Sequence, residues 1–153
     1  MNKSAFTLIE LLVVVAVIGV LATVPIIALR GGTSKARDSQ RRSDLKQYQV
    51  VLETYANSHS GFYPSRNSSS GAVVSTLCSD LGLSDCVDDP QGSSSYRYQT
   101  NGSGGGNSDA SAYLIWAQLE YPATPTTWAV VCSNGKTGET SSGIPPTGGV
   151  CPL

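Results

Sequence analysis

Glu10 is the residue most clearly expected to have a chemical role, because it lies inside an apolar segment. From Ala5 to Leu29 the chain is almost entirely apolar, and Glu10 is the only charged residue of this segment. A carboxylate is costly in lipid, so an ionisable group in such a segment is expected to have a function and a partner. If the chain is cut between Ala5 and Phe6, the new α-amino group of Phe6 lies about one helical turn from Glu10. We expect that amine to pair with the Glu10 of a neighbouring copy.

Four cysteines form the second group with possible chemistry. They contain no Cys-x-x-Cys spacing, and the single histidine, His59, stands apart from them, which argues against a zinc site. Four cysteines allow three pairings. We favour Cys78 with Cys86 and Cys132 with Cys151, because each pair closes a local loop through turn-forming residues. Each bond would stabilise the folded C-terminal part of the chain by roughly 2–4 kcal/mol. Free buried thiols are the alternative.

Four aspartates crowd one short segment and are candidate ligands for a hard cation. They are Asp80, Asp85, Asp88 and Asp89. Calcium takes carboxylate oxygens from loops of this kind, but the spacing does not fit the EF-hand pattern. We therefore favour solvated acids and helix caps, with weak calcium binding as the alternative.

Two more groups have simpler explanations. His59 stands between two serines, but the sequence offers neither a nucleophile elbow nor a third catalytic member, so a solvated histidine at a helix end is favoured. Arg37, Arg41 and Arg42 could contact DNA phosphates. That stretch lacks the interleaved aromatic residues that single-strand binding requires, so a solvated or inter-subunit helix face is favoured.

The charge distribution gives conflicting information about topology. The 153 residues have a formal net charge of −1, but six bases face two acids between Arg30 and Lys46, and three bases face eight acids from Gln47 onward. The bases that follow the apolar segment would place the C-terminal part in the cytoplasm. The cysteines argue for the opposite side, because disulfides need an oxidising compartment. We follow the cysteines.

Two helical segments are expected to precede a sheet. The apolar segment is long enough to cross a bilayer, and Pro25 should kink it. Gly31-Gly32 is expected to form a joint before an amphipathic helix over about 33–58. The apolar face of that helix consists of Leu45, Tyr48, Leu52 and Tyr55. The part before Leu45 is polar on all sides, so we expect solvent or other subunits to cover it.

Strands are expected in the C-terminal part of the chain. The expected strands are Tyr96–Thr100, Ala112–Tyr121 and Thr127–Cys132. One or two helical turns over Val73–Leu83 come before them, and the tail from Ser141 is expected to be loop. The strands should bury Tyr113, Val130 and either Ile115 or Trp116. The predicted fold class is α+β, a long N-terminal helical spine packed on a small antiparallel sheet of about three strands.

The N-terminal sequence resembles a known signal. A short basic leader, residues 1–5, is followed by FTLIELLVVVAVIGVLA, which resembles the start of type IV pilins and type II secretion pseudopilins. The segment from Ala36 to Pro64 resembles the spine of major-pseudopilin-like pilins, in which a Tyr-Pro pair follows the helix. The resemblance implies cleavage by a prepilin peptidase between Ala5 and Phe6, N-methylation of Phe6, and a role for Glu10 in subunit assembly. The family usually has glycine where this chain has Ala5.

The sequence therefore predicts a structural subunit and not an enzyme. Its expected parts are a cleaved leader (1–5), a transmembrane and filament-core helix (6–29) and a pilin-like head (30–153). The subunit would enter the bacterial inner membrane, meet an assembly platform there, and form a helical homo-oligomer on the cell surface. Two alternatives are a pseudopilin of a periplasmic secretion filament and a minor subunit that binds DNA or surfaces. No cofactor is expected beyond the calcium alternative.

Overall fold

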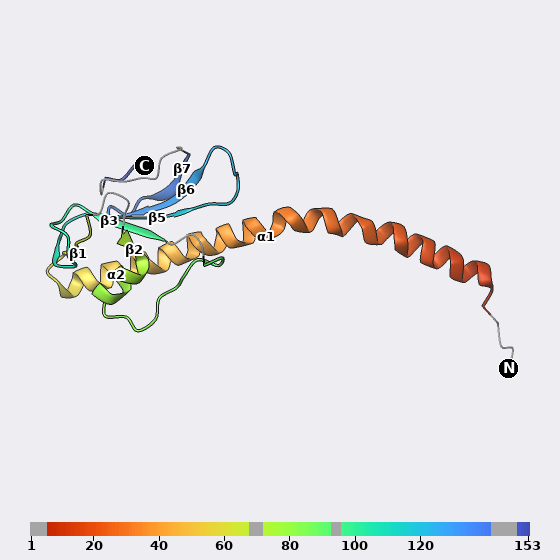
Figure 1. The fold of residues 1–153 in the computed structure, drawn as a ribbon, viewed down its shortest axis with the longest axis horizontal. Coiled ribbons are helices and arrows are strands. Elements are labelled where there is room, and N and C mark those ends of the chain that lie inside the picture. The colour runs from red at the N-terminus through yellow and green to blue at the C-terminus, as the bar shows by residue number, and fades with distance from the viewer. Residues whose placement is uncertain (1–5, 68–71, 93–95, 142–149) are drawn as a thin grey trace. The chain divides into compact units, whose positions relative to one another are not determined.

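The computed structural model describes residues 6–67, 72–92, 96–141 and 150–153, with the backbone alone at 23–31 and 72–73 (Figure 1). The predicted leader, including Ala5, lies outside the described residues. The chain divides into two units, Met1–Lys35 and Ala36–Leu153, and each is described by itself. Helix α1, Leu8–Ser58, contributes its first part to one unit and its second part to the other.

The first unit presents an apolar helix surface that is exposed in the described residues. Phe6 and Leu8 are each 82% exposed, and the large apolar side chains from Ile9 to Leu21 are exposed as well. Within the described residues, no helix is both long enough and apolar enough to cross a membrane. The predicted span continues through 23–31, whose side chains are not described, so it stays a prediction.

Helix α1 is continuous where the sequence predicted two segments. It runs without interruption past Pro25 and through Gly31-Gly32, so the expected joint before a second helix is not formed. Each glycine costs only about 1 kcal/mol in a helix interior. Helix formation is cooperative, so a helix that is long on both sides can continue through two such residues.

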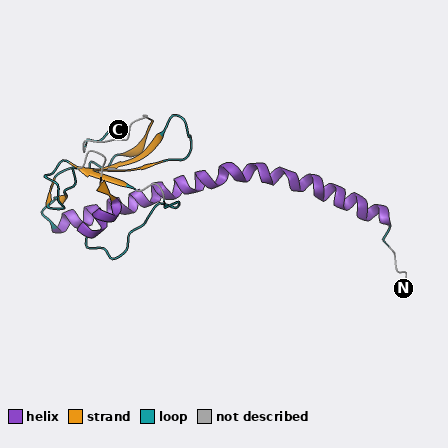
Figure 2. Cartoon of the chain, in the orientation of Figure 1, coloured by secondary structure: helices purple, strands orange, loops and turns teal. Residues whose placement is uncertain are grey.

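The second unit contains a five-stranded antiparallel sheet that lies along the second part of α1 (Figure 2). In spatial order its strands are β2 (Ala72–Val73), β3 (Arg97–Thr100), β5 (Tyr113–Gln118), β6 (Thr127–Cys132) and β7 (Thr137–Ser141). A separate two-stranded sheet pairs β1 (Tyr63–Pro64) with β4 (Ser108–Ala110). The short helix α2, Val74–Asp80, follows β2 directly.

The α+β class with a long helix on an antiparallel sheet is confirmed, but the sheet is larger than predicted. The three predicted strands correspond to β3, β5 and β6. Strand β7 was missed because its sequence, TGETS, is polar and largely exposed, so it shows no apolar alternation. It pairs with β6 through a turn after Cys132, in a register that places Val130 opposite Gly138.

Both faces of the sheet are buried. Towards α1, the core consists mainly of Leu45, Tyr48, Leu52, Ala56, Tyr113, Ile115, Ala117, Ala129 and Val131. On the other face, Leu114, Trp116 and Val130 form a second cluster, against which Cys151 and Leu153 of the tail pack. The sequence predicted burial of either Ile115 or Trp116, and both are buried. The reason is that the tail covers the face of the sheet that would otherwise meet solvent.

Two disulfides hold this arrangement. Cys78 is bonded to Cys86 and Cys132 to Cys151, with Cα atoms 6.0 and 5.7 Å apart, as the sequence favoured. The second bond ties the tail to β6. Lys136 adds a hydrogen bond of 2.9 Å from its Nζ to the carbonyl oxygen of Leu153.

The packing of α1 on the sheet predicts the effect of two aliphatic truncations. Leu52 is fully buried, whereas Val50 on the same helix is 66% exposed. Leu52→Ala should lower the free energy of unfolding by about 2–5 kcal/mol, because it leaves a cavity. Val50→Ala, the matched control, should change it by less than about 0.5 kcal/mol. Denaturant unfolding of the full chain in detergent, followed by tryptophan fluorescence, measures both, and equal effects would contradict this packing.

Candidate functional site: the start of the helix and the charged residues of the head

Glu10 lies in a capping box at the start of α1. The backbone N–H and the hydroxyl of Thr7 both donate hydrogen bonds to Glu10 Oε2, at 3.0 and 2.9 Å. In return, the Glu10 N–H donates to Thr7 Oγ1 at 3.3 Å. This reciprocal pair is the Thr-x-x-Glu capping box, a signal that was readable in the sequence. The carboxylate is therefore held at the helix N-terminus, next to Phe6, which is the predicted N-terminal residue of the cut chain.

The surface around Glu10 is an uncovered apolar stripe. A shallow groove on this part of α1 is lined by Leu12, Val13, Ala16, Val17, Val20 and Leu21. Contiguous apolar surface with a defined charge at one end indicates an interaction site for protein or lipid.

A buried arginine organises the charged residues of the head. The side chain of Arg41 is only 1% exposed, and it makes two hydrogen bonds to Asp89, at 2.7 and 2.9 Å. Its Nη1 also donates to Asp38 at 2.8 Å and to Glu120 at 2.6 Å. The hydrogen bonds to Asp89 raise the pKa of the guanidinium above its usual value. Arg41 therefore stays charged and needs all of these acceptors.

This cluster attaches two loops to α1. Asp38 accepts hydrogen bonds from the backbone N–H groups of Glu120 and Tyr121, both at 2.9 Å. Arg37 donates to Glu120 at 2.8 Å, and this hydrogen bond lowers the pKa of Glu120 to about 2. The prediction that solvent or other subunits cover the polar part of the helix is therefore wrong at Asp38 and Arg41. Their partners are loops of the same chain, far away in the sequence.

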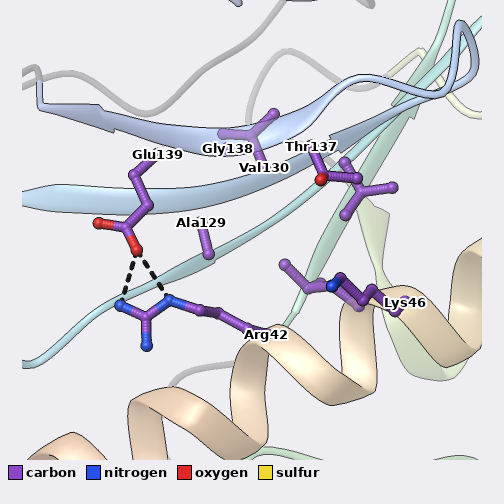
Figure 3. Close-up of a pocket in the computed structure, with 9 residues that line it drawn as sticks. Arg42, Lys46, Ala129, Val130, Thr137, Gly138 and Glu139 are labelled. Atoms are coloured by element: carbon purple, nitrogen blue, oxygen red, sulfur yellow. Dashed lines mark hydrogen bonds and ion pairs between the residues drawn. The ribbon is translucent and has the colours of Figure 1, made fainter.

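The three arginines considered for DNA binding are all neutralised within the chain. Arg37 and Arg41 belong to the buried cluster, and Arg42 pairs with Glu139 of β7 at 2.7 Å (Figure 3). Phosphate binding needs basic side chains whose charge is free for the nucleic acid. The geometry of these residues gives no support to a DNA site on this face of α1.

The four aspartates considered for calcium do not act as one group. Asp80 pairs with Arg66 at 2.7 Å and Asp89 with Arg41, while Asp85 and Asp88 are exposed. Within the described part of the chain, no three metal-binding side chains are grouped so that they could hold an ion. Calcium binding therefore gains no support from the positions of these side chains.

His59 and a group of tyrosines have structural roles. The His59 ring stacks on Tyr55 with centroids 3.7 Å apart. Tyr63 and Tyr113 both donate from their hydroxyls to Glu53, at 3.0 and 3.1 Å. Burial raises the pKa of Tyr63 to about 12, so its hydroxyl stays protonated and continues to donate. The sequence did not single out Glu53, because nothing local indicates its distant partners.

The buried cluster predicts unequal effects for two neighbouring arginines. Arg41→Met leaves the buried carboxylates of Asp38 and Asp89 without their cation, which should lower the free energy of unfolding by about 3–5 kcal/mol. Arg42→Met removes a half-exposed pair and should cost at most about 1 kcal/mol. Denaturant unfolding measures both variants under the same conditions. Similar losses would show that the cluster does not fix the head.

The lowered pKa of Glu120 predicts that the folded chain loses stability at low pH. Its pKa falls from the ordinary 4.5 to about 2 in the folded chain, so its contribution is fully present above 4.5. The contribution should disappear as the pH drops from 4.5 towards 2. The measurement is the free energy of unfolding against pH for the wild type and for Glu120→Gln. The difference between the two curves should shrink over this window, and a constant difference would contradict the assigned ion pairs.

The comparisons with known proteins agree with this geometry. Residues 1–24 match the family model described as the prokaryotic N-terminal methylation motif. Over 75 residues the chain is 39% identical to a fimbrial protein of Neisseria meningitidis serogroup A. This match covers 48% of the chain and 43% of the relative, so the chain spans less than half of that protein's length. No solved structure matches the chain. The chain is therefore similar, at its N-terminus, to proteins that carry the methylation motif and, over about half of its length, to a fimbrial protein.

Proposed function

We propose that this chain is a structural subunit of a type IV pilus-like filament. A prepilin peptidase cuts it between Ala5 and Phe6 and methylates Phe6, and the mature subunit polymerises through the first part of α1. The observation that carries the proposal is the exposed apolar surface from Phe6 to Leu21, which contains one acid, Glu10, and lies inside the methylation motif.

The cohesion of the filament comes from burial of this apolar surface against the same surface of neighbouring copies. Full burial of one large aliphatic or aromatic side chain is worth about 1.5–3 kcal/mol. Several exposed side chains of this kind, among them Phe6, Leu8, Ile9 and Leu11, supply such burial in each copy. Burial alone has no preferred register, since neighbouring apolar helices can slide along one another.

Glu10 supplies the register. The capping box holds its carboxylate at the amino end of α1, where the helix dipole also favours a negative charge. The amine of Phe6 from a neighbouring copy reaches that carboxylate only in one alignment of the two helices. In any other alignment the buried charges are unpaired, which costs roughly 3–5 kcal/mol.

The route to the filament starts in the bacterial inner membrane. The apolar segment anchors the precursor there, with the leader on the cytoplasmic side near the peptidase and the assembly platform, and with the head on the other side. The two disulfides of the head support this orientation, because they form and persist in oxidising compartments.

A pseudopilin of a type II secretion system is the second candidate, with the same chemistry but a short periplasmic filament. The sequence from Ala36 to Pro64 resembles the spine of that group and favours it. The disulfide-held tail and the fimbrial relative favour a surface pilus. Electron microscopy of material sheared from the cell surface separates the two, since only a pilus yields long fibres there.

The role of Glu10 predicts a specific assembly defect. Glu10→Ala should abolish filaments while leaving membrane insertion intact, because it removes the acceptor of the neighbouring amine. Thr7→Val is the matched control, since it removes the capping hydroxyl at a cost of about 1 kcal/mol but keeps the carboxylate. Filament yield is measured by shearing and microscopy. Wild-type yield from Glu10→Ala would refute the proposed role.

The intact mass of the wild-type protein is the accompanying measurement. It should report loss of residues 1–5, one added methyl group, and two disulfides. A native protein that still begins at Met1 and remains monomeric would contradict the whole proposal.

A further inference from the structure

Three exposed charges of the head are candidates for contacts with a second copy, although one of them, Asp88, also accepts a hydrogen bond from the Asp89 N–H at 2.7 Å. Lys46, Asp85 and Asp88 are exposed, and in the described residues none of them takes part in an ion pair. By contrast, Arg41 and Arg42 are both paired with acids of the same chain. Lys46 and the two acids are therefore among the exposed charges of the head that have no ion pair in the described residues.

Lys46 lies at the edge of a pocket between α1 and the end of the sheet. The pocket has a volume of about 150 Å³. On one side are Arg42 and Lys46 of α1, and on the other are residues of β7, including Glu139 (Figure 3). Leu45, Ala129 and Val131 contribute apolar lining. Since Arg42 is neutralised by Glu139, Lys46 gives the edge of the pocket a net positive charge.

The two acids flank an apolar side chain on a well-anchored loop. Val87 lies between Asp85 and Asp88 in the sequence and is 38% exposed. Its carbonyl oxygen accepts a hydrogen bond from the Tyr48 hydroxyl at 2.5 Å. The Cys78–Cys86 disulfide and the ion pair of Asp89 with Arg41 hold the residues on either side. An anchored loop loses little conformational entropy on binding, which favours a role in recognition.

The pocket and the loop lie on opposite sides of α1. In Figure 1, β6 and β7 lie on one side of the helix and the loop that follows α2 lies on the other. One chain therefore cannot fill its own pocket with its own loop. A contact between two different surfaces of identical subunits is heterologous, and it builds an open helical assembly when its rotation does not close into a ring.

We propose that Val87 of one copy enters this pocket on the next copy, with Asp85 and Asp88 facing Lys46. The apolar side chain matches the apolar lining, and the two carboxylates match the unpaired cation. This contact rests on the proposed filament, where it joins the heads of successive subunits while the helices join the core.

A charge exchange tests the pairing. Lys46→Glu and Asp88→Lys should each lower the yield of sheared filaments at least about tenfold, because like charges then face each other across the contact. The double variant should restore most of the yield. Gln40→Glu, the control, adds a negative charge at an exposed position of α1 that does not line the pocket, and it should keep the wild-type yield. Wild-type yields from the single variants, or no recovery in the double variant, would overturn the contact.

Photo-crosslinking separates the contact from the filament itself. A photoreactive amino acid at position 87 of the full chain should give a dimer in filaments, and mass spectrometry should place the bond within the pocket, near Lys46 or Val131. Filaments without that bond would overturn the contact and leave the proposed function standing. Absence of filaments from the wild type, with an uncut N-terminus, would overturn both.

Discussion

The burial of Arg41 is the constraint on which the geometry of the head depends. A guanidinium inside a protein must have all its donors satisfied, and here Asp89, Asp38 and Glu120 provide the acceptors. Such a cluster contributes little net stability, because desolvation offsets most of the attraction between the charges. Its effect is to select one arrangement of the head. Two loops must approach α1 in one arrangement, and the anchored segment around Val87 follows from that arrangement.

Helix α1 reverses the usual distribution of polarity. Its apolar beginning is exposed from Leu8 to Leu21, whereas its polar middle includes three buried charged residues, Asp38, Arg41 and Asp44. These buried charges have their partners within the head. The exposed apolar part has no such cover in the described residues, and contiguous apolar surface of this kind indicates contact with protein or lipid. The same helix therefore joins a head whose buried charges are paired to a segment whose apolar surface is exposed.

The sequence predicted those features that depend on local patterns. Strand β6 was predicted with its observed bounds, because TWAVVC alternates and ends at clear turn residues. A lone acid in an apolar run predicts a functional role for Glu10 from the sequence alone, but the capping box with Thr7 was missed. Strand β7 was missed because a polar hairpin partner has no apolar signature of its own. The partners of Arg41 were missed for a different reason, since Asp89 and Glu120 lie 48 and 79 residues away and only the fold brings them together.

A filament built only from apolar helices would have cohesion without a defined rotation between subunits. Dispersion and burial change little when one smooth apolar helix slides or turns against another, so these forces cannot select one symmetry. A charge pair has a steeper dependence on distance, particularly where water is excluded. Glu10 is placed to fix the alignment along the helix axis. Selection of the rotation requires a further directional contact, and the proposed pairing of Lys46 with the acids beside Val87 is a contact of that kind.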